Sequence, residues 1–218
     1  MNKNTEEKIR ISKSGALLYL KNPRFSMTAL AEAAELKTEK IYDYFSNRRD
    51  VLDFFYEGLI LEYEESVRSI EKYDEYTLSE KLSNLALTIL DLMDPYKEFI
   101  RHTYSERVMC SRRTTSFEKH FRRQLKAIYE SDANQSRLSS ALNREPLYKA
   151  GLFNFHLLIR FWLNDNSVAN QKTMEFVDKW TAFVEEIHYS SILDRGFDVA
   201  KFLFYNSPFA NTSKNKTP

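Results

Sequence analysis

Apolar residues recur at helical spacing along almost the whole chain, and this pattern restricts the fold more than any other feature. Glycine occurs only four times and proline five times in 218 residues, and no two glycines are adjacent. Alternating Val, Ile and Thr runs, which are typical of strands, are absent. The length is sufficient for one large or two small domains with a substantial core. We therefore predict an all-α protein.

The segment from residue 26 to residue 52 predicts two short helices joined by a tight turn, followed by the start of a long third helix. Ser26 is suited to cap the first short helix, and Asn47 with Asp50 resembles a capping box for the third. Small and apolar side chains share one face of each short helix: Leu30, Ala31, Ala34, Ile41, Tyr44 and Phe45. This arrangement is typical of the helix-turn-helix, whose second helix can enter the major groove of DNA.

The same segment resembles the tetracycline-repressor (TetR) family of bacterial one-component regulators. The resemblance is carried by Leu30-Ala31, Ala34, Leu36, the run Ile41-Tyr42-Asp43-Tyr44-Phe45, and Asn47-Arg48-Arg49-Asp50-Val51-Leu52. The family pattern is an Ile-Ala pair, a turn, a Leu-Tyr-x-x-Phe element and a Ser-Lys-x-x-Leu helix start. The resemblance covers the first quarter of the chain. It implies an N-terminal helix-turn-helix three-helix domain, followed by a larger helical-bundle domain that binds an effector and dimerises.

Three residues depart from the family pattern. Glu35 stands where the turn usually has Gly, and a left-handed conformation costs a non-Gly residue about 1–2 kcal/mol. Lys37 stands where a Ser usually caps the recognition helix, so Thr38 is expected to cap instead. Arg48 replaces the usual Lys and keeps a positive charge directed at phosphate. The first two departures affect the turn and the base-reading residues, but not the fold.

The resemblance and the outward-facing positions together predict a DNA-contacting set: Ser26, Thr28, Lys37, Thr38, Glu39, Lys40, Tyr42 and Arg48. Tyr42 matches a family position that hydrogen-bonds a phosphate, and the alternative is a tyrosine packed on the surface. The lysines and Arg48 are expected at the DNA backbone, although ordinary solvated charges would give the same sequence. Which of residues 37–40 touches a base edge stays open.

The charge distribution fits a protein that makes a few phosphate contacts. The net charge is only +1, but residues 1–50 carry ten Lys/Arg against seven Asp/Glu, an excess of +3, which leaves −2 for the remainder. A modestly positive end on a neutral body suits selective contact with DNA and argues against a general nucleic-acid coat.

We expect a DNA-binding domain over residues 1–50, an effector-binding and dimerisation domain over 51–210, and a disordered tail over 211–218. A helix over 48–70 would link the two domains. The other helices are expected over 5–21, 146–163, 172–189 and 198–205, with further starts at Thr77, Asp94-Pro95 and Thr115. The first helix would cover the reading motif with four side chains: Ile9, Ala16, Leu17 and Leu20.

Aromatic residues make up 14% of the chain, more than one small core needs, so some rings are expected at a ligand cavity or a dimer face. We predict an apolar or aromatic small-molecule effector lined by Phe99, Tyr104, Phe121, Phe155 and Trp162. The last two long helices pair across subunits in the family, which implies a homodimer interface formed by Phe155, Leu158, Ile159, Trp162, Phe176, Trp180 and Phe183.

Several functional classes find no support. The four histidines have no metal-ligand spacing, and glycine-rich phosphate loops and Gly-x-Ser-x-Gly are absent, so we expect no metal, no cofactor and no enzymatic activity. Membrane insertion is not expected, since no apolar run reaches 18 residues. The lone Cys110 and the lack of an apolar leader indicate the cytoplasm. The densest basic run is interpreted as a solvated helix face, with a second nucleic-acid patch or an anionic-ligand site as the alternatives: Arg112, Arg113, Lys119, Arg122, Arg123 and Lys126.

The sequence therefore predicts a dimeric transcriptional regulator that binds a pseudo-palindromic double-stranded DNA operator, with repression as the family's commoner mode. The rival is a helical module that binds a small molecule or a protein and has weakened DNA binding. Glu35, Glu39 and Asp43 motivate this rival, because three carboxylates would oppose the approach of phosphate.

Overall fold

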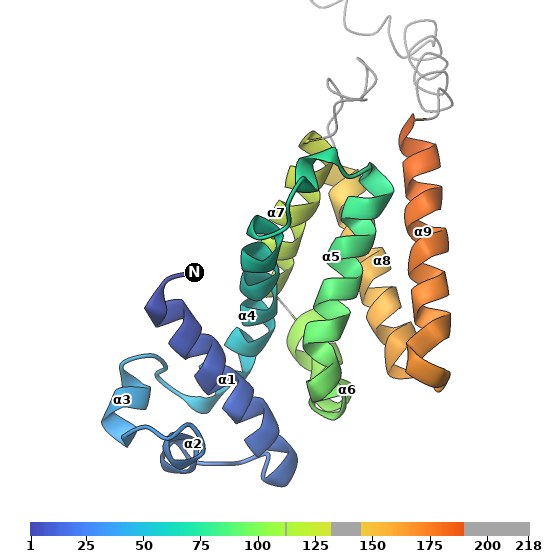
Figure 1. Ribbon diagram of the computed structural model, residues 1–218. Helices are drawn as coiled ribbons and strands as arrows, with labels where there is room; N and C mark the ends of the chain where they lie inside the picture. Colours follow the sequence, from blue (N-terminus) through green and yellow to red (C-terminus); the bar gives the residue numbers. More distant parts are fainter. Residues whose placement is uncertain (112, 132–144, 190–218) are drawn as a thin grey trace, which may run out of the picture.

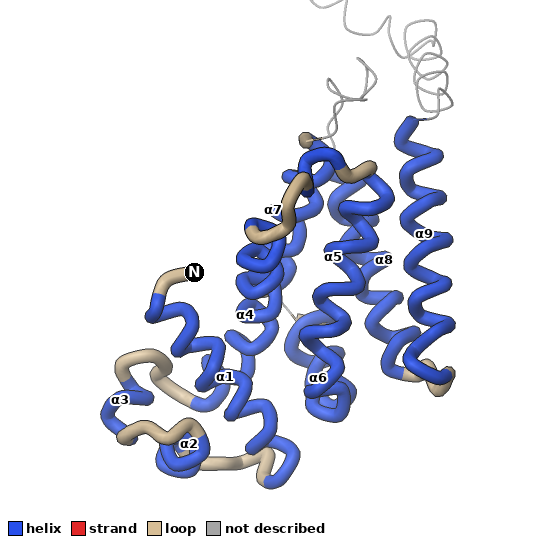
Figure 2. Tube along the Cα trace, viewed as in Figure 1, coloured by secondary structure: helices blue, strands red, loops and turns tan. Residues whose placement is uncertain are grey.

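The computed structural model describes residues 1–111, 113–131 and 145–189, and every regular element in these ranges is a helix (Figure 2). The all-α prediction is confirmed. The short helix expected over 198–205 and the tail expected from residue 211 lie outside the described residues.

Three helices form one end of the molecule: α1 (Lys3–Lys21), α2 (Met27–Ala33) and α3 (Thr38–Tyr42) (Figure 1). The turn between α2 and α3 is a Schellman motif, in which Leu36 N–H donates to the carbonyl of Ala31 (2.9 Å) and Glu35 N–H to that of Glu32 (3.1 Å). Glu35 adopts the left-handed conformation that this motif requires, with φ of 55°. Glu35 therefore takes a conformation that is costly for a non-Gly residue, at the position where the family pattern has Gly.

The long helix α4 (Arg48–Arg68) connects this end to the rest of the chain, close to the predicted 48–70. Asn47 is its N-cap residue, and the Asn47 side chain accepts a hydrogen bond from Asp50 N–H at 3.1 Å. The Asp50 carboxylate binds the Asn47 amide (2.8 Å) and not its backbone, so the capping box is only half formed.

Helix α1 runs antiparallel to α4 along most of its length. A Cβ atom at Gly15 would lie 2.7 Å from Val51 Cγ1, and one at Gly58 would lie 3.1 Å from Ile9 Cγ1. At the far end the N-terminal amine pairs with Glu65 at 2.6 Å. Glycine is needed at residue 15 because any side chain there would push the two helices apart.

The remaining helices form the body: α5 (Leu78–Met93), α6 (Lys97–Tyr104), α7 (Ser116–Glu130), α8 (Glu145–Leu163) and α9 (Gln171–Tyr189). Short segments join them: the 3-10 turns η1 (Tyr73–Glu75), η2 (Asp94–Tyr96) and η4 (Val168–Asn170), and the π-helix η3 (Ser105–Met109). Helix α7 packs between α4 and α8, and α9 packs on α5 (Figure 1).

The predicted starts of the body helices are local features that the structure reproduces. Thr77 with Glu80 and Thr115 with Glu118 form complete capping boxes, each with the backbone-to-carboxylate bond at 2.7 Å. The helix expected at Asp94-Pro95 starts differently, because a 3-10 turn occupies residues 94–96 before α6.

An aromatic cluster joins α4, α6, α7 and α8 into one core. Phe121 and Phe155 approach most closely, with ring centroids 4.3 Å apart. Offset and edge-to-face contacts extend this pair through further buried rings: Phe55, Tyr56, Phe99, Tyr104 and Phe117.

The predicted inner face of α1 is partly wrong. Ile9 and Ala16 are buried as expected, but Leu17 and Leu20 are 49% and 43% exposed. The close contact at Gly15 and the packing of Tyr19 on Phe99 of α6 (5.4 Å between ring centroids) turn the other side of the helix inward.

The left-handed Glu35 generates a stability prediction. Glu35→Gly should raise the free energy of unfolding by about 1 kcal/mol relative to Glu35→Gln, because glycine adopts positive φ without steric cost. Both variants remove the same charge, so their difference isolates the backbone effect. Urea denaturation followed by circular dichroism measures it, and equal stability of the two variants would contradict the strain.

Candidate nucleic-acid interface and adjoining cavity

Helix α3 presents polar side chains to solvent while one apolar side chain holds it in place. Ile41 is completely buried, whereas Tyr42 is 53% exposed. Lys37, Glu39 and Lys40 are also exposed. The outward side of α3 and its N-cap residue therefore expose four of the residues predicted to contact DNA: Lys37, Glu39, Lys40 and Tyr42.

The beginning of α2 supplies the other predicted DNA-contacting residues. Ser26 caps α2 by accepting from Ala29 N–H at 3.1 Å, as its sequence position predicts. Thr28, in the first turn, is exposed. Arg10 of α1 donates from Nη1 to the carbonyl of Ala34 at 2.7 Å and so supports the turn that leads to α3.

The predicted cap of α3 is wrong. Thr38 is the first helical residue and is partly buried, and the N-cap position is occupied by Lys37, which makes no side-chain cap bond. A lysine has only donors and cannot accept from the free N–H groups of the first turn. The helix therefore lacks the local stabilisation that α2 and α4 have at their starts.

The carboxylates on this face compete for its cations. Lys40 Nζ donates to Asp43 Oδ2 at 3.0 Å, and this hydrogen bond raises the pKa of the Lys40 ammonium. Both side chains are exposed, so solvent screens the pair and another anion can displace Asp43. Glu35 and Glu39 are exposed on the same surface.

Arg48 has a partner inside the molecule. Its Nη1 donates to the carbonyl of Phe25 at 3.2 Å, and its guanidinium lies 5.8 Å from the centre of the Phe25 ring. Arg49, which was not among the predicted residues, has a side chain that is 82% exposed. The adjacent arginines 48 and 49 at the start of α4 are the sequence signal that could have identified Arg49 as a candidate for contact with an anion.

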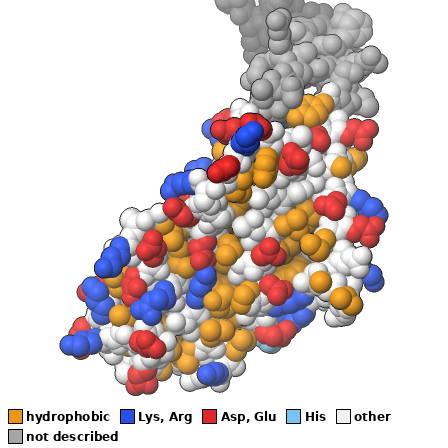
Figure 3. All heavy atoms as spheres, in the orientation of Figure 1, with side chains coloured by type: hydrophobic (Ala, Val, Ile, Leu, Met, Phe, Trp, Pro, Cys, Tyr) orange, Lys and Arg blue, Asp and Glu red, His pale blue; other side chains and the backbone are white. Residues whose placement is uncertain are grey.

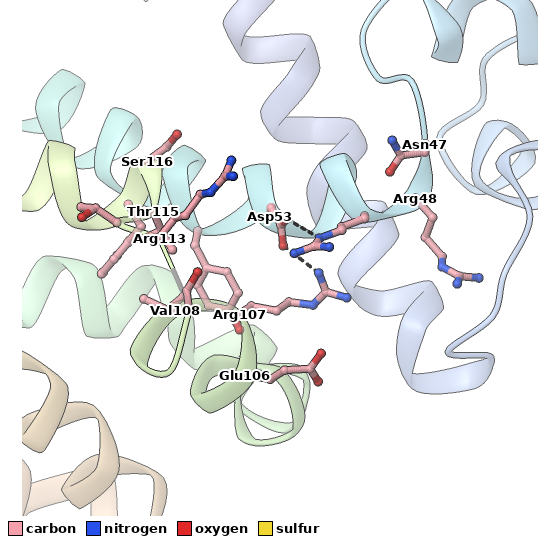
Figure 4. Close-up of a pocket in the computed structure, with 14 residues that line it drawn as sticks. Asn47, Arg48, Asp53, Glu106, Arg107, Val108, Arg113, Thr115 and Ser116 are labelled. Carbon is pink, nitrogen blue, oxygen red and sulfur yellow. Dashed lines mark hydrogen bonds and ion pairs between the residues drawn. The ribbon is translucent and has the colours of Figure 1, made fainter.

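A cavity of about 630 Å³ lies between the start of α4, the π-helix η3 and the start of α7 (Figure 4). An ion pair crosses it from α4 to η3, with Arg107 Nη1 2.7 Å from Asp53 Oδ1. Arg49 Nε lies 3.4 Å from the other oxygen of the same carboxylate. The sequence contains no signal for this cavity, because its ion pair joins residues 54 positions apart.

The residues predicted to line an effector cavity fill the core in this structure. Phe99, Tyr104, Phe121, Phe155 and Trp162 are at most 2% exposed and pack on one another or on neighbouring side chains. None of the five lines the 630 Å³ cavity. Burial raises the pKa of Tyr104, whose hydroxyl is 2.8 Å from His156 Nδ1.

A smaller cavity of about 480 Å³ lies between α7 and α8. Its walls include Glu118 and His156, whose carboxylate oxygen and Nε2 are 3.7 Å apart. Burial acts to raise the pKa of Glu118, but the nearby His156 imidazole and the hydrogen bonds from Thr115 outweigh it, and the pKa is lowered.

Four of the residues predicted at the dimer interface lie inside the protomer. Phe155, Leu158, Ile159 and Trp162 are at most 1% exposed, because the side of α8 that carries them faces the core. Phe176 and Trp180 are partly buried and Phe183 is 60% exposed, all on α9. The large apolar residues that are exposed on the two helices are instead Phe153, Leu157, Phe161, Met174, Phe183, Ile187 and Tyr189.

The basic run that follows α6 is divided among separate ion pairs. Arg122 pairs with Glu145, and Arg123 Nη2 lies 2.6 Å from Glu64. Arg113 lines the 630 Å³ cavity, and Arg112 lies outside the described residues. Cys110 is exposed.

The described residues form neither a metal site nor a membrane-spanning helix. No group of three or more His, Cys, Asp or Glu side chains is arranged to hold a metal ion. None of the helices in these ranges combines the length and apolarity needed to cross a bilayer.

The missing cap of α3 can be tested by supplying one. Lys37→Ser should be more stable than Lys37→Ala by about 1 kcal/mol, because the serine hydroxyl accepts from an N–H group that has no side-chain partner in the native chain. Both variants lose the lysine charge, which makes alanine the matched control. Urea denaturation provides the comparison, and an alanine variant as stable as the serine variant would rule out the capping deficit.

Comparison with known proteins links this geometry to a family. The model of the tetracyclin repressor-like C-terminal domain matches residues 81–203, more than half of the chain. The structure of a tetR family transcription regulator from Shewanella sp. PV-4 superposes with a TM-score of 0.53 and 14% identity over 82% of this chain and 95% of that one, and it supports the fold alone. No curated protein matches. The match over 81–203 is independent of the N-terminal motif at residues 26–52, and both lead to one conclusion: the chain belongs to the TetR family of transcription regulators.

Proposed function

We propose that the protein is a ligand-responsive repressor that binds a pseudo-palindromic DNA operator as a homodimer. The observation that carries the proposal is the exposure of Lys37, Lys40 and Tyr42 at α3. This helix follows the turn of the helix-turn-helix, and the buried Ile41 anchors it to the core. Two copies of such a helix, spaced one helical turn of DNA or a multiple of it apart, would enter successive major grooves of an operator.

The contacts follow from the exposed groups. The Tyr42 hydroxyl can donate to a phosphate, and the hydroxyls of Ser26 and Thr28 lie at the start of α2, where N–H groups also favour an anion. Lys40 would leave Asp43 for a phosphate, since both partners of that pair are exposed. Base reading falls to residues 37–40 at the start of α3.

The homodimer is proposed to form through the exposed apolar side chains of α8 and α9. On α8, Phe153, Leu157 and Phe161 follow one another at intervals of four residues and so form a stripe along the helix. Phe183 and Ile187 do the same on α9. These helices lie at the opposite side of the body from α2 and α3 (Figure 1), and apolar side chains are visible over α5 and α9 in Figure 3. A second copy would cover this apolar surface.

The second candidate function is a helical module that binds a small molecule or a protein and binds DNA weakly. The Lys40–Asp43 pair favours it, because Lys40, one of the lysines proposed to contact DNA, already has a carboxylate partner. The salt dependence of DNA binding distinguishes the two candidates.

The DNA proposal predicts that Lys40→Ala weakens binding to duplex DNA from upstream of the protein's own gene. The slope of log K against log [salt] should become shallower by about one contact. Lys126→Ala is the matched control, since Lys126 is also exposed and pairs with a nearby glutamate, but lies on α7. Fluorescence anisotropy at several salt concentrations measures both. Identical slopes for the two variants, or no binding by the unaltered protein, would favour the second candidate.

The dimer proposal predicts that Phe183→Glu shifts the protein to monomers in analytical ultracentrifugation, because a charge would be buried in the interface. Leu17→Glu is the control: Leu17 is a similarly exposed apolar residue, but it lies on α1, away from α8 and α9. Circular dichroism checks that both variants fold. If the Phe183 variant associates as strongly as the Leu17 variant, the interface does not include this part of α9.

A further inference from the structure

The 630 Å³ cavity between α4, η3 and α7 has an excess of positive charge. Four arginines contribute to its lining (Arg48, Arg49, Arg107 and Arg113), against two carboxylates, Asp53 and Glu106. The Arg48 side chain extends away from the Arg107–Asp53 pair in Figure 4 and is held by Phe25. The Arg113 side chain also extends away from this pair in Figure 4, so Arg49 and Arg107 are the two guanidinium groups that meet at Asp53.

One carboxylate is shared by two guanidinium groups. Asp53 Oδ1 lies 2.7 Å from Arg107 Nη1, and Asp53 Oδ2 lies 3.4 Å from Arg49 Nε. Asp53 neutralises one of these two charges, and Arg113, which forms no ion pair with any described residue, adds a positive charge that Glu106 of the same lining offsets. Arg107 is the least exposed of the bonded pair, with 18% of its side chain accessible. A charged fork held this way is suited to a planar or tetrahedral oxyanion.

The start of α7 adds donors to the same wall. Thr115 and Glu118 satisfy each other's backbone N–H groups in the capping box, which leaves the N–H groups of Ser116 and Phe117 without helical partners. Both residues line the cavity. The positive end of the helix dipole therefore reinforces the arginines.

The inner part of the cavity is apolar. Tyr56 and Phe117 are each 1% exposed, and their rings make an edge-to-face contact at 6.3 Å. The Tyr56 hydroxyl is bonded to Thr103 at 2.6 Å and is not free to bind a ligand, and the burial of both rings leaves only a small part of each at the cavity wall. Val108 of η3 completes this surface.

We propose that this cavity binds a small molecule with an oxyanion head group, a carboxylate or phosphate, on an aromatic or short apolar body. Arg107 and Arg49 hold the head group, and the edges of Tyr56, Phe117 and Val108 contact the body. The anion competes with Asp53 for Arg107 and thereby loosens the only ion pair described between α4 and η3. An effect of this loosening on DNA affinity rests on the proposed function, whereas the binding of the anion does not.

Isothermal titration calorimetry without DNA tests the site with three probes: benzoate, phenyl phosphate and neutral benzamide. Saturable binding is expected for the two anions and not for benzamide. Arg107→Gln should weaken anion binding about tenfold or more, the effect of a lost charge-assisted hydrogen bond. Arg68→Gln is the matched control, because Arg68 lies on α4 and pairs with one carboxylate at 2.9 Å, but at the opposite end of the helix.

Asp53→Asn distinguishes competition from a loss of structure. It removes the internal competitor and retains the shape of the side chain, so anions should bind several-fold more tightly, whereas a damaged fold would bind them more weakly. Absence of saturable binding, or equal affinities for the native protein, Arg107→Gln and Asp53→Asn, would overturn the proposal. If Arg107→Gln lowers DNA affinity and leaves the anion titration unchanged, the arginines contact the DNA backbone and the site is refuted. Because the titration contains no DNA, its result is independent of whether the protein binds an operator.

Discussion

The packing of α1 directly on α4 is the constraint on which the remaining structure depends. Gly15 permits this approach, since an added carbon would come within 2.7 Å of Val51. The contact continues past Gly58 to Glu62, which pairs with Lys13 at 2.6 Å. The same α4 buries Phe55 and Leu59 in the body. The orientation of α2 and α3 is therefore set by one continuous helix. A displacement of α4 in the body would move its N-terminal end, and with it α1, α2 and α3.

The sequence predicted what depends on neighbours in the chain. Helix starts at Ser26, Asn47, Thr77 and Thr115 agree with the structure because a cap is made by residues within one turn. The left-handed Glu35 was also predictable, since the turn needs a residue with positive φ whatever the side chain. The same reasoning failed at Thr38, where a shift of one residue left Lys37 in the capping position.

Features that depend on distant parts of the chain were not predictable. A helix such as α8 with apolar residues on a wide face gives no indication of which half faces inward, and Phe155 is buried while Phe153, two residues earlier, is 60% exposed. The aromatic residues expected around an effector fill the core, because rings at helical spacing look the same in either role. The Asp53–Arg107 pair appears only when α4 and η3 are brought together.

The antiparallel pairing of α1 and α4 affects how this protein could be recombined with a relative. A crossover after residue 50 would separate Gly15 from the Val51 that fits against it, and Ile9 from Gly58. The transplanted α1 would then lie on the α4 of the other parent, which lacks the residues that fit against Gly15 and Ile9. A chimaera that exchanges operator preference would have to carry α4 to Arg68 to keep this contact, and the body of the other parent would have to fit the side of α4 that packs on α6 and α7.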